Sequence, residues 1–144
     1  RVVGKPMESL KVVMAGAGAE GIAIAKLLAQ VGVANVLLLD SKGAIGLHRA
    51  DLTSVKQAIA MVTNPEGLRG SIAEVLPGAD VFIGVSAANT VTAEMVKSMA
   101  PDPIVLALAN PDPEILPDEA VDGFVEAFVI VVRELRAEMG TDGL

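Results

Sequence analysis

Three glycines near the start of the chain constrain its fold more than any other feature. Gly16, Gly18 and Gly21 stand at G-x-G-x-x-G spacing, directly after the apolar run "VVMA" and at the start of a helix-like run. The spacing alone is a weak signal, since its ordinary meaning is a tight turn. A strand before it and a helix after it are the context of a dinucleotide-binding turn. In that turn Gly16 would permit the bend, Gly18 the close approach of a pyrophosphate, and Gly21 close helix–strand packing.

Apolar runs and helical patterns alternate along the rest of the chain. Continuous apolar runs, typical of parallel strands covered on both faces, occupy residues 12–15, 36–39, 81–85 and 104–109. Helical patterns occupy residues 20–30, 53–62 and 71–76, and Thr92 is a predicted N-cap of another. In the second helix, Val55, Ile59 and Val62 would share one apolar face. The sequence therefore predicts an α/β fold, a Rossmann-like doubly wound parallel sheet, as a single domain over residues 1–144.

The C-terminal tail, residues 121–144, is ambiguous. Apolar residues recur there at helical spacing, whereas "FVIVV" alone would fit a strand; the helical set is Phe124, Phe128, Val132, Leu135 and Met139. We favour a C-terminal helix. If its apolar face did not pack on the sheet, it would invite self-association into a homo-oligomer.

Charge and composition exclude several classes of partner. The net charge is −7 and the basic residues are scattered, which argues against a nucleic-acid partner. No apolar run approaches the roughly 18 residues of a membrane span, so no membrane partner is expected. The chain has no cysteine, which is compatible with the cytoplasm. An anionic ligand would have to be held by backbone N–H groups and a helix N-terminus.

An acidic residue stands where a dinucleotide-binding fold needs one. Asp40 closes "VLLLD", 19 residues after Gly21, and a carboxylate there accepts hydrogen bonds from the adenosine ribose. The alternative is an ordinary turn residue at a strand end. Asp40 favours NAD, but Ser41 and Lys42 follow it and could accommodate the 2′-phosphate of NADP, so the cofactor preference stays open.

Polar residues also follow the third and fourth predicted strands. Ser86, Asn89 and Asn110 would face the same cleft as Gly16, because ligands of open α/β sheets bind outside the carboxyl ends of the strands. For Asn110 a plain turn residue is the alternative. The single histidine, His48, lacks a visible orienting partner and is predicted to lie in a surface loop.

Long stretches of the chain resemble one enzyme family. "MAGAGAEGIAIAKLL", "LLLDSKGAI", "TNPEGLRGSIAEVLPGADVFIGVSA" and "TAEMVKSMAPDPIVLALANPDPEILPDEA" resemble the NAD(P)-binding domain of bacterial malic enzymes, over residues 2–120. Malic enzymes oxidise malate with NAD or NADP, decarboxylate the product and release pyruvate, using Mg²⁺ or Mn²⁺. The resemblance places Ser86 and Ala87 beside the nicotinamide, and Asn110 matches the asparagine of the family's "ANP" motif. With the glycine turn, the candidate cofactor contacts are Gly16, Ala17, Gly18, Ala19, Glu20, Gly21, Asp40, Ser41, Lys42, Ser86, Ala87 and Asn110.

The chain departs from the family in ways that bear on catalysis. The family's Tyr and Lys acid/base residues and its acidic metal ligands belong to segments upstream of this domain, and this chain has no tyrosine. We interpret "EILPDEA" as a solvated turn and helix start, and residues 121–144 do not follow the family pattern. We therefore assign no catalytic residue and no metal ligand. Because turnover needs a base and a divalent cation, we expect cofactor binding without turnover, with malate and Mg²⁺ or Mn²⁺ relevant only to the full-length enzyme.

Two other hypotheses remain open. The chain could be a catalytically silent Rossmann-like binding or interaction module. It could also be a different small dehydrogenase on the same fold, since a fold does not fix a function. The long matched stretches favour the malic-enzyme interpretation.

Overall fold

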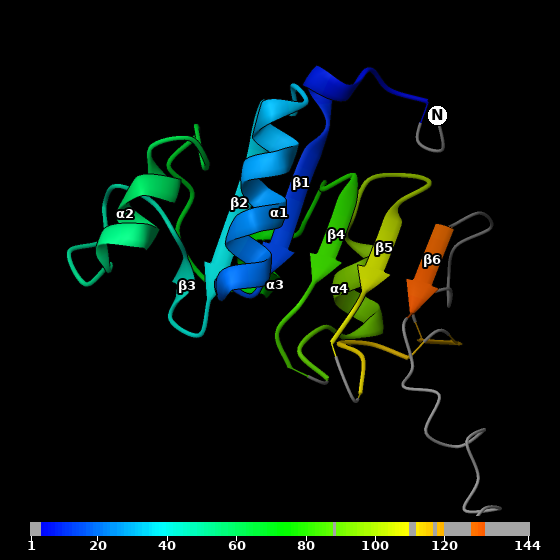
Figure 1. Cartoon of the computed structure of the whole chain (residues 1–144). Coiled ribbons are helices and arrows are strands. Elements are labelled where there is room, and N and C mark those ends of the chain that lie inside the picture. The colour runs from blue at the N-terminus through cyan, green and yellow to red at the C-terminus, as the bar shows by residue number, and fades with distance from the viewer. Residues whose placement is uncertain (1–3, 88, 110–111, 117, 120–127, 132–144) are drawn as a thin grey trace, which may run out of the picture.

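The computed structural model describes residues 4–87, 89–109, 112–116, 118–119 and 128–131. In these residues one sheet has the strand order β3-β2-β1-β4-β5-β6, and Figure 1 shows it nearly face on. All neighbouring strands run parallel except the β2–β3 pair. The strands are β1 (Lys11–Ala15), β2 (Asn35–Asp40), β3 (Gly43–Ala44), β4 (Val81–Gly84), β5 (Ile104–Ala107) and β6 (Phe128–Val131).

Helices cover both faces of this sheet. They are η1 (Met7–Ser9), α1 (Ala19–Gln30), α2 (Ser54–Ala60), α3 (Ile72–Val75) and α4 (Ala93–Lys97). In Figure 1, α1 and α2 lie in front of the sheet, whereas α3 and α4 lie behind it. The predicted Rossmann-like, doubly wound α/β fold is confirmed.

The alternation of residues along β1 shows why its sequence is apolar without interruption. Val12 and Met14 belong to the core cluster under α1 and α2, and Val13 and Ala15 belong to the cluster on the other face. Each strand residue is therefore covered on one side or the other, and all four are buried. At about 1.5–3 kcal/mol for each large aliphatic side chain buried, these two layers supply much of the folding free energy.

Short helices begin at side-chain caps. Thr53 accepts a hydrogen bond from Lys56 N at the start of α2, and Thr92, the predicted N-cap, accepts one from Met95 N at the start of α4. Ser71 and Glu74 form a capping box at α3. Such caps contribute about 1 kcal/mol each, which matters in helices too short to be stable alone.

The apolar face predicted for α2 was wrong in two of its three residues. Ile59 is fully buried, but Val55 is 52% exposed and Val62 is 57% exposed. The helix ends at Ala60, so Val62 lies beyond it, and α2 packs on the core through Ile59 and Ala60.

The expected C-terminal helix was wrong for residues 128–131. These form the parallel strand β6, whose residues Phe128 and Val131 pair with Ile104 and Ala107 of β5. The physical reason is long-range: β5 offers an unpaired backbone edge, and the "FVIV" segment satisfies it by pairing. The rest of the tail, including Phe124, Val132, Leu135 and Met139, lies outside the described residues.

The sheet has a switch point between β1 and β4, where the strand order changes direction. The chain leaves β1 toward β2 on one side and returns to place β4 on the other side, so the loops after β1 and β4 diverge and leave a crevice. None of the helices in the described residues is long and apolar enough to cross a lipid bilayer.

Candidate functional site

A cavity of about 790 Å³ opens at the carboxyl ends of β1, β2 and β4, within the size range of cofactor sites. Eight predicted residues line it: Gly16, Ala17, Gly18, Asp40, Ser41, Lys42, Ser86 and Ala87. Ala19, Glu20 and Gly21 do not line it, nor do Asn89 and His48, and Asn110 lies outside the described residues. Residues that the sequence did not single out also line it. They come from α2, from the α3 region, from the segment after β4 and from α4, and they are Lys56, Gly70, Ser71, Ile72, Ala73, Thr90 and Met95.

The three glycines of the turn have different physical roles. Gly16 has φ of 115°, and a Cβ there would lie 2.8 Å from the carbonyl oxygen of Val85. A Cβ on Gly21 would collide with the carbonyl oxygen of Gly16, so Gly21 packs against the turn itself. Gly18 has ordinary backbone angles, and a Cβ added to it would meet no atom within 4 Å. Gly16 and Gly21 are thus required by the backbone, whereas Gly18 only keeps space open.

The start of α1 presents main-chain donors at this turn. Gly18 is the N-cap of α1 and forms no side-chain cap hydrogen bond. The first N–H groups of a helix have no partner within the helix and carry a partial positive charge. A phosphate placed over Gly18 would accept hydrogen bonds from them. Glu20, in the first turn, is exposed and does not line the cavity.

Asp40 lies at the β2 end of the cavity in a cluster of charges. Its Oδ1 accepts hydrogen bonds from Arg49 Nη1 at 2.7 Å and from Lys42 N at 2.9 Å, and its Oδ2 accepts one from Lys56 Nζ at 2.7 Å. The Asp40 side chain is 9% exposed. Burial by itself raises the pKa of this carboxyl, but the hydrogen bonds from Arg49 and Lys56 outweigh it and lower the pKa to about 2.

The side-chain cations that bind Asp40 are Arg49 and Lys56, whereas the sequence had indicated Lys42 at this end of the site. The Lys42 side chain is 69% exposed and its ammonium pairs with Asp51 at 3.2 Å, although Lys42 lines the cavity. Lys56, from α2, both lines the cavity and reaches Asp40. The hydrogen bonds that Arg49 donates to Asp51 and Asp40 raise the pKa of Arg49, which stays charged. No local motif marks Lys56 or Arg49, because only the folded positions of α2 and of the loop before it bring them to Asp40.

At the other end of the cavity a buried carboxylate joins two strands. Glu114 is fully buried; its Oε1 accepts a hydrogen bond from Ser86 N at 2.9 Å and its Oε2 accepts one from Ala109 N at 3.1 Å. Ser86 follows β4 and Ala109 follows β5. The interpretation of "EILPDEA" as a solvated turn was therefore wrong at Glu114 and Ile115, which is also fully buried.

One sequence signal could have indicated this burial. Gly84 interrupts the apolar run "VFIGV", and a glycine inside a strand often marks a close approach by another group. A Cβ on Gly84 would collide with the carboxyl group of Glu114. The glycine thus leaves the space that the carboxylate occupies.

The described residues do not fit a divalent cation. No group of three or more His, Cys, Asp and Glu side chains that could hold a metal occurs among them. Asp40, the carboxylate of the cavity, already has both oxygens on cationic side chains. Mg²⁺ and Ca²⁺ need several free oxygen ligands, so no step can be assigned to a metal here.

Comparison with known proteins identifies the family. Residues 1–122 match the family described as "Malic enzyme, NAD binding domain". The chain is 52% identical to the bifunctional malic/malolactic enzyme of Bacillus subtilis over 121 residues, which cover 83% of this chain and 30% of that protein. It is 46% identical to the NADP-dependent malic enzyme of Haemophilus influenzae, covering 83% of this chain and 16% of that protein.

A solved structure gives the same result. The NAD-dependent malic enzyme of Thermotoga maritima superposes with a TM-score of 0.84 at 42% identity, covering 90% of this chain and 35% of that one. The chain thus spans about a third or less of the length of these relatives. By its sequence and its fold, the chain belongs to the malic enzyme family as an NAD-binding domain.

Proposed function

We propose that this chain binds the NAD or NADP of a malic enzyme in the cavity at the switch point. The adenosine ribose would lie at Asp40, the pyrophosphate over Gly16 and Gly18, and the nicotinamide beside Ser86 and Ala87. One observation carries this proposal: a single cavity extends from Asp40, past the glycine turn, to Ser86. Its central part is the open space over Gly18, which a side chain would fill. The position of Asn110 beside the nicotinamide stays a prediction.

The parent reaction follows from the family. We propose that the full-length protein oxidatively decarboxylates malate to pyruvate, and that this chain supplies the cofactor site. When bound, the dinucleotide accepts the hydride. The described residues of the cavity offer donors for phosphate and an acceptor for ribose. The base that removes the hydroxyl proton, and the ligands of Mg²⁺ or Mn²⁺, would come from the part of the enzyme that this chain does not include. The chain alone would then bind cofactor without turnover.

The relatives support both cofactors. The Thermotoga protein is named NAD-dependent, and the Haemophilus protein is named NADP-dependent. Asp40 suits the 2′-hydroxyl of NAD, while Lys56 and Lys42 line the same end of the cavity and suit a phosphate. We expect measurable affinity for both. The cytoplasm and a homo-oligomeric assembly remain our expectations for the full-length protein.

The test is calorimetric titration of the chain with NAD and with NADP, for the wild type and for Gly18→Val. Gly18 has φ of −75° and open space around it, so valine should fold normally and fill the phosphate site. We expect the variant to weaken binding at least tenfold, an effect of about 1.4 kcal/mol or more. The control is Ala23→Val, which adds similar bulk to an exposed position of the same helix.

Thermal unfolding of both variants would show that they remain folded. Wild-type binding of either cofactor, lost in Gly18→Val and kept in Ala23→Val, supports the proposal. Equal binding by Gly18→Val and the wild type would show that the turn does not hold the phosphates. If the wild type bound neither cofactor, the chain would be a silent Rossmann-like module.

A further inference from the structure

We propose that Glu114 is a positioning residue for the nicotinamide half of the site. It does not line the cavity, but it holds the two backbone segments that leave β4 and β5 at the end of the cavity where Ser86 lies. This inference rests on the proposed function, since it assigns the role within the same dinucleotide site.

The hydrogen bonds of Glu114 connect two neighbouring strands just past their last paired residues. Gly84 and Ala107 are the last registered pair of β4 and β5. Beyond that pair the ladder continues with one further bond, from Leu108 N to Gly84 O at 2.9 Å. The two oxygens of Glu114 then accept the next donors on each side, Ser86 N and Ala109 N. The carboxylate therefore holds together the two segments that follow β4 and β5, beyond the last hydrogen bond between these strands.

The main chain of residues 113–114 also binds the segment that follows β4. Val91 N donates to the carbonyl oxygen of Glu114 at 3.2 Å, and Asn89 N donates to the carbonyl oxygen of Pro113 at 3.3 Å. The segment after β4 is thus attached to residues 113–114 at three points, at Ser86, Asn89 and Val91. Residues of this segment, Ser86, Ala87 and Thr90, line the cavity.

A carboxylate in this position does more than fill space. An apolar side chain could occupy the volume beside Gly84, but it could not accept two N–H groups. The hydrogen bond from Ala109 N is buried and that from Ser86 N is partly buried. A buried N–H group without an acceptor is costly, so the segments would move to find other partners. A group that locks the residues around a site keeps the site in its binding geometry before the ligand arrives. The geometry thus assigns Glu114 to the alignment of the nicotinamide end.

The position of Glu114 makes the proposed effect local. Asp40 and its cations form the opposite end of the cavity, and none of their hydrogen bonds involves Glu114. Removing the charge of Glu114 should weaken contacts to the nicotinamide half and leave those to the adenosine half unchanged. A residue that only stabilised the fold would affect both halves equally.

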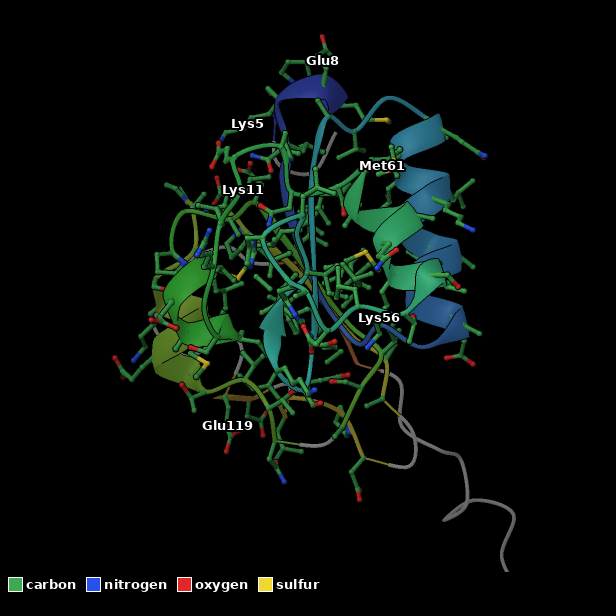
Figure 2. All side chains as sticks on the ribbon, turned by 90° about the vertical axis from the view of Figure 1, so that its left-hand side faces the viewer. Lys5, Glu8, Lys11, Lys56, Met61 and Glu119 are labelled. Atoms are coloured by element: carbon green, nitrogen blue, oxygen red, sulfur yellow. The ribbon has the colours of Figure 1, made fainter. Side chains whose placement is uncertain are left out.

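The experiment compares Glu114→Gln with Asp80→Asn, by titration with NAD and with ADP, which lacks the nicotinamide nucleoside. Glutamine keeps the shape but turns one acceptor oxygen into an NH₂ group that faces a backbone N–H. Asp80 is a matched control, because it is also a buried carboxylate that accepts a backbone N–H, from Lys11 at 3.0 Å. Asp80 precedes β4 and so lies at the amino ends of the strands, opposite the cavity. Its partners Lys5 and Lys11 lie far from Lys56 of the cavity in Figure 2.

We expect Glu114→Gln to raise the Kd for NAD about tenfold, the effect of one lost hydrogen bond to a charged group, and to change the Kd for ADP less than about twofold. Asp80→Asn should change neither Kd more than about twofold. Equal weakening of NAD and ADP by Glu114→Gln, or no change for NAD, would overturn the positioning role. Wild-type protein that bound neither ligand would instead overturn the proposed function, and this inference with it.

A second measurement does not depend on a variant that folds. Amide hydrogen exchange of the unliganded wild type reports directly on the two N–H groups that Glu114 accepts. We expect the amides of Ser86 and Ala109 to exchange at least about a hundredfold more slowly than in an unstructured peptide, because both donate to a buried acceptor. Exchange at the unstructured rate before ligand binding would show that the segments are not held in advance.

Discussion

Asp40 and Glu114 are two carboxylates near the carboxyl ends of the strands, and different kinds of donor stabilise them. Asp40 is held mainly by the side-chain cations of Arg49 and Lys56. Glu114 is held by the backbone amides of Ser86 and Ala109. The first arrangement holds charged side chains in place but restrains little of the main chain. The second restrains the main chain, because its donors are backbone amides. An end of a site built in the first way can rearrange around a ligand, and an end built in the second way is set in advance.

The difference has energetic consequences. Ion pairs depend on pH and, where they reach solvent, on salt concentration. Hydrogen bonds from amides to a buried carboxylate depend on geometry, and a buried amide left without an acceptor costs its full desolvation. Mutations at Glu114 should therefore act mainly on stability and alignment, and changes in solution conditions mainly on the Asp40 cluster.

The largest effect is expected from Glu114→Ala. This change leaves two N–H groups without an acceptor and opens a cavity beside Gly84. The buried Ala109 amide costs about 1–3 kcal/mol when unsatisfied, and the partly buried Ser86 amide and the new cavity add to it, so we expect a loss of roughly 3 kcal/mol in the free energy of unfolding. Urea unfolding followed by circular dichroism measures it. Glu119→Ala, at an exposed position, is the control and should stay within about 0.5 kcal/mol of the wild type. A loss under about 1 kcal/mol for Glu114→Ala would mean that the two carboxylates do not differ as described.

A smaller, pH-dependent effect is expected at Asp40. Its folded pKa of about 2 is below the usual 3.8, so its contribution is present above about pH 4 and is lost as the pH falls toward 2. That shift corresponds to about 2 kcal/mol. Asp40→Asn should be less stable than the wild type by about this amount at about pH 6, and the difference should vanish near pH 2. Unfolding titrations at several pH values test this, and a constant difference across the range would contradict it.

The smallest effect is expected from Lys42→Ala. The Lys42–Asp51 pair is exposed, and such pairs contribute about 0–1 kcal/mol. We expect a change in unfolding free energy below about 0.5 kcal/mol, which about 1 M NaCl removes. Lys56→Ala, in contrast, removes a cation bonded to a nearly buried carboxylate and should cost more. Equal effects of the two lysine variants would show that burial does not make the Lys56–Asp40 pair more stabilising than the exposed Lys42–Asp51 pair.

Much of the fold could be predicted because its signals are local. The glycine spacing, the apolar runs and the cap at Thr92 each depend on a few consecutive residues. The same is true of Asp40, whose place at the end of β2 follows from its distance along the chain. These features predicted most of the sheet and six residues of the cavity; Ser86 and Ala87 followed from the strand ends and the family resemblance of long sequence stretches.

The sequence by itself predicted the glycine turn, the strands β1, β2, β4 and β5, and the helices between them, since backbone preferences and apolar periodicity operate within a few residues. Tertiary structure alone decided which charged side chains form ion pairs and which polar groups are buried. Lys56, on α2, and Arg49, in the loop between β3 and α2, meet Asp40 only in the folded chain. Glu114 is buried where Gly84 leaves space for it. The "FVIV" segment became a strand because β5 had an edge to pair. Burial and charge pairing depend on contacts between distant segments. Gly84 marks a close approach, but no local pattern identifies Glu114, or the cations of Asp40, as the partners.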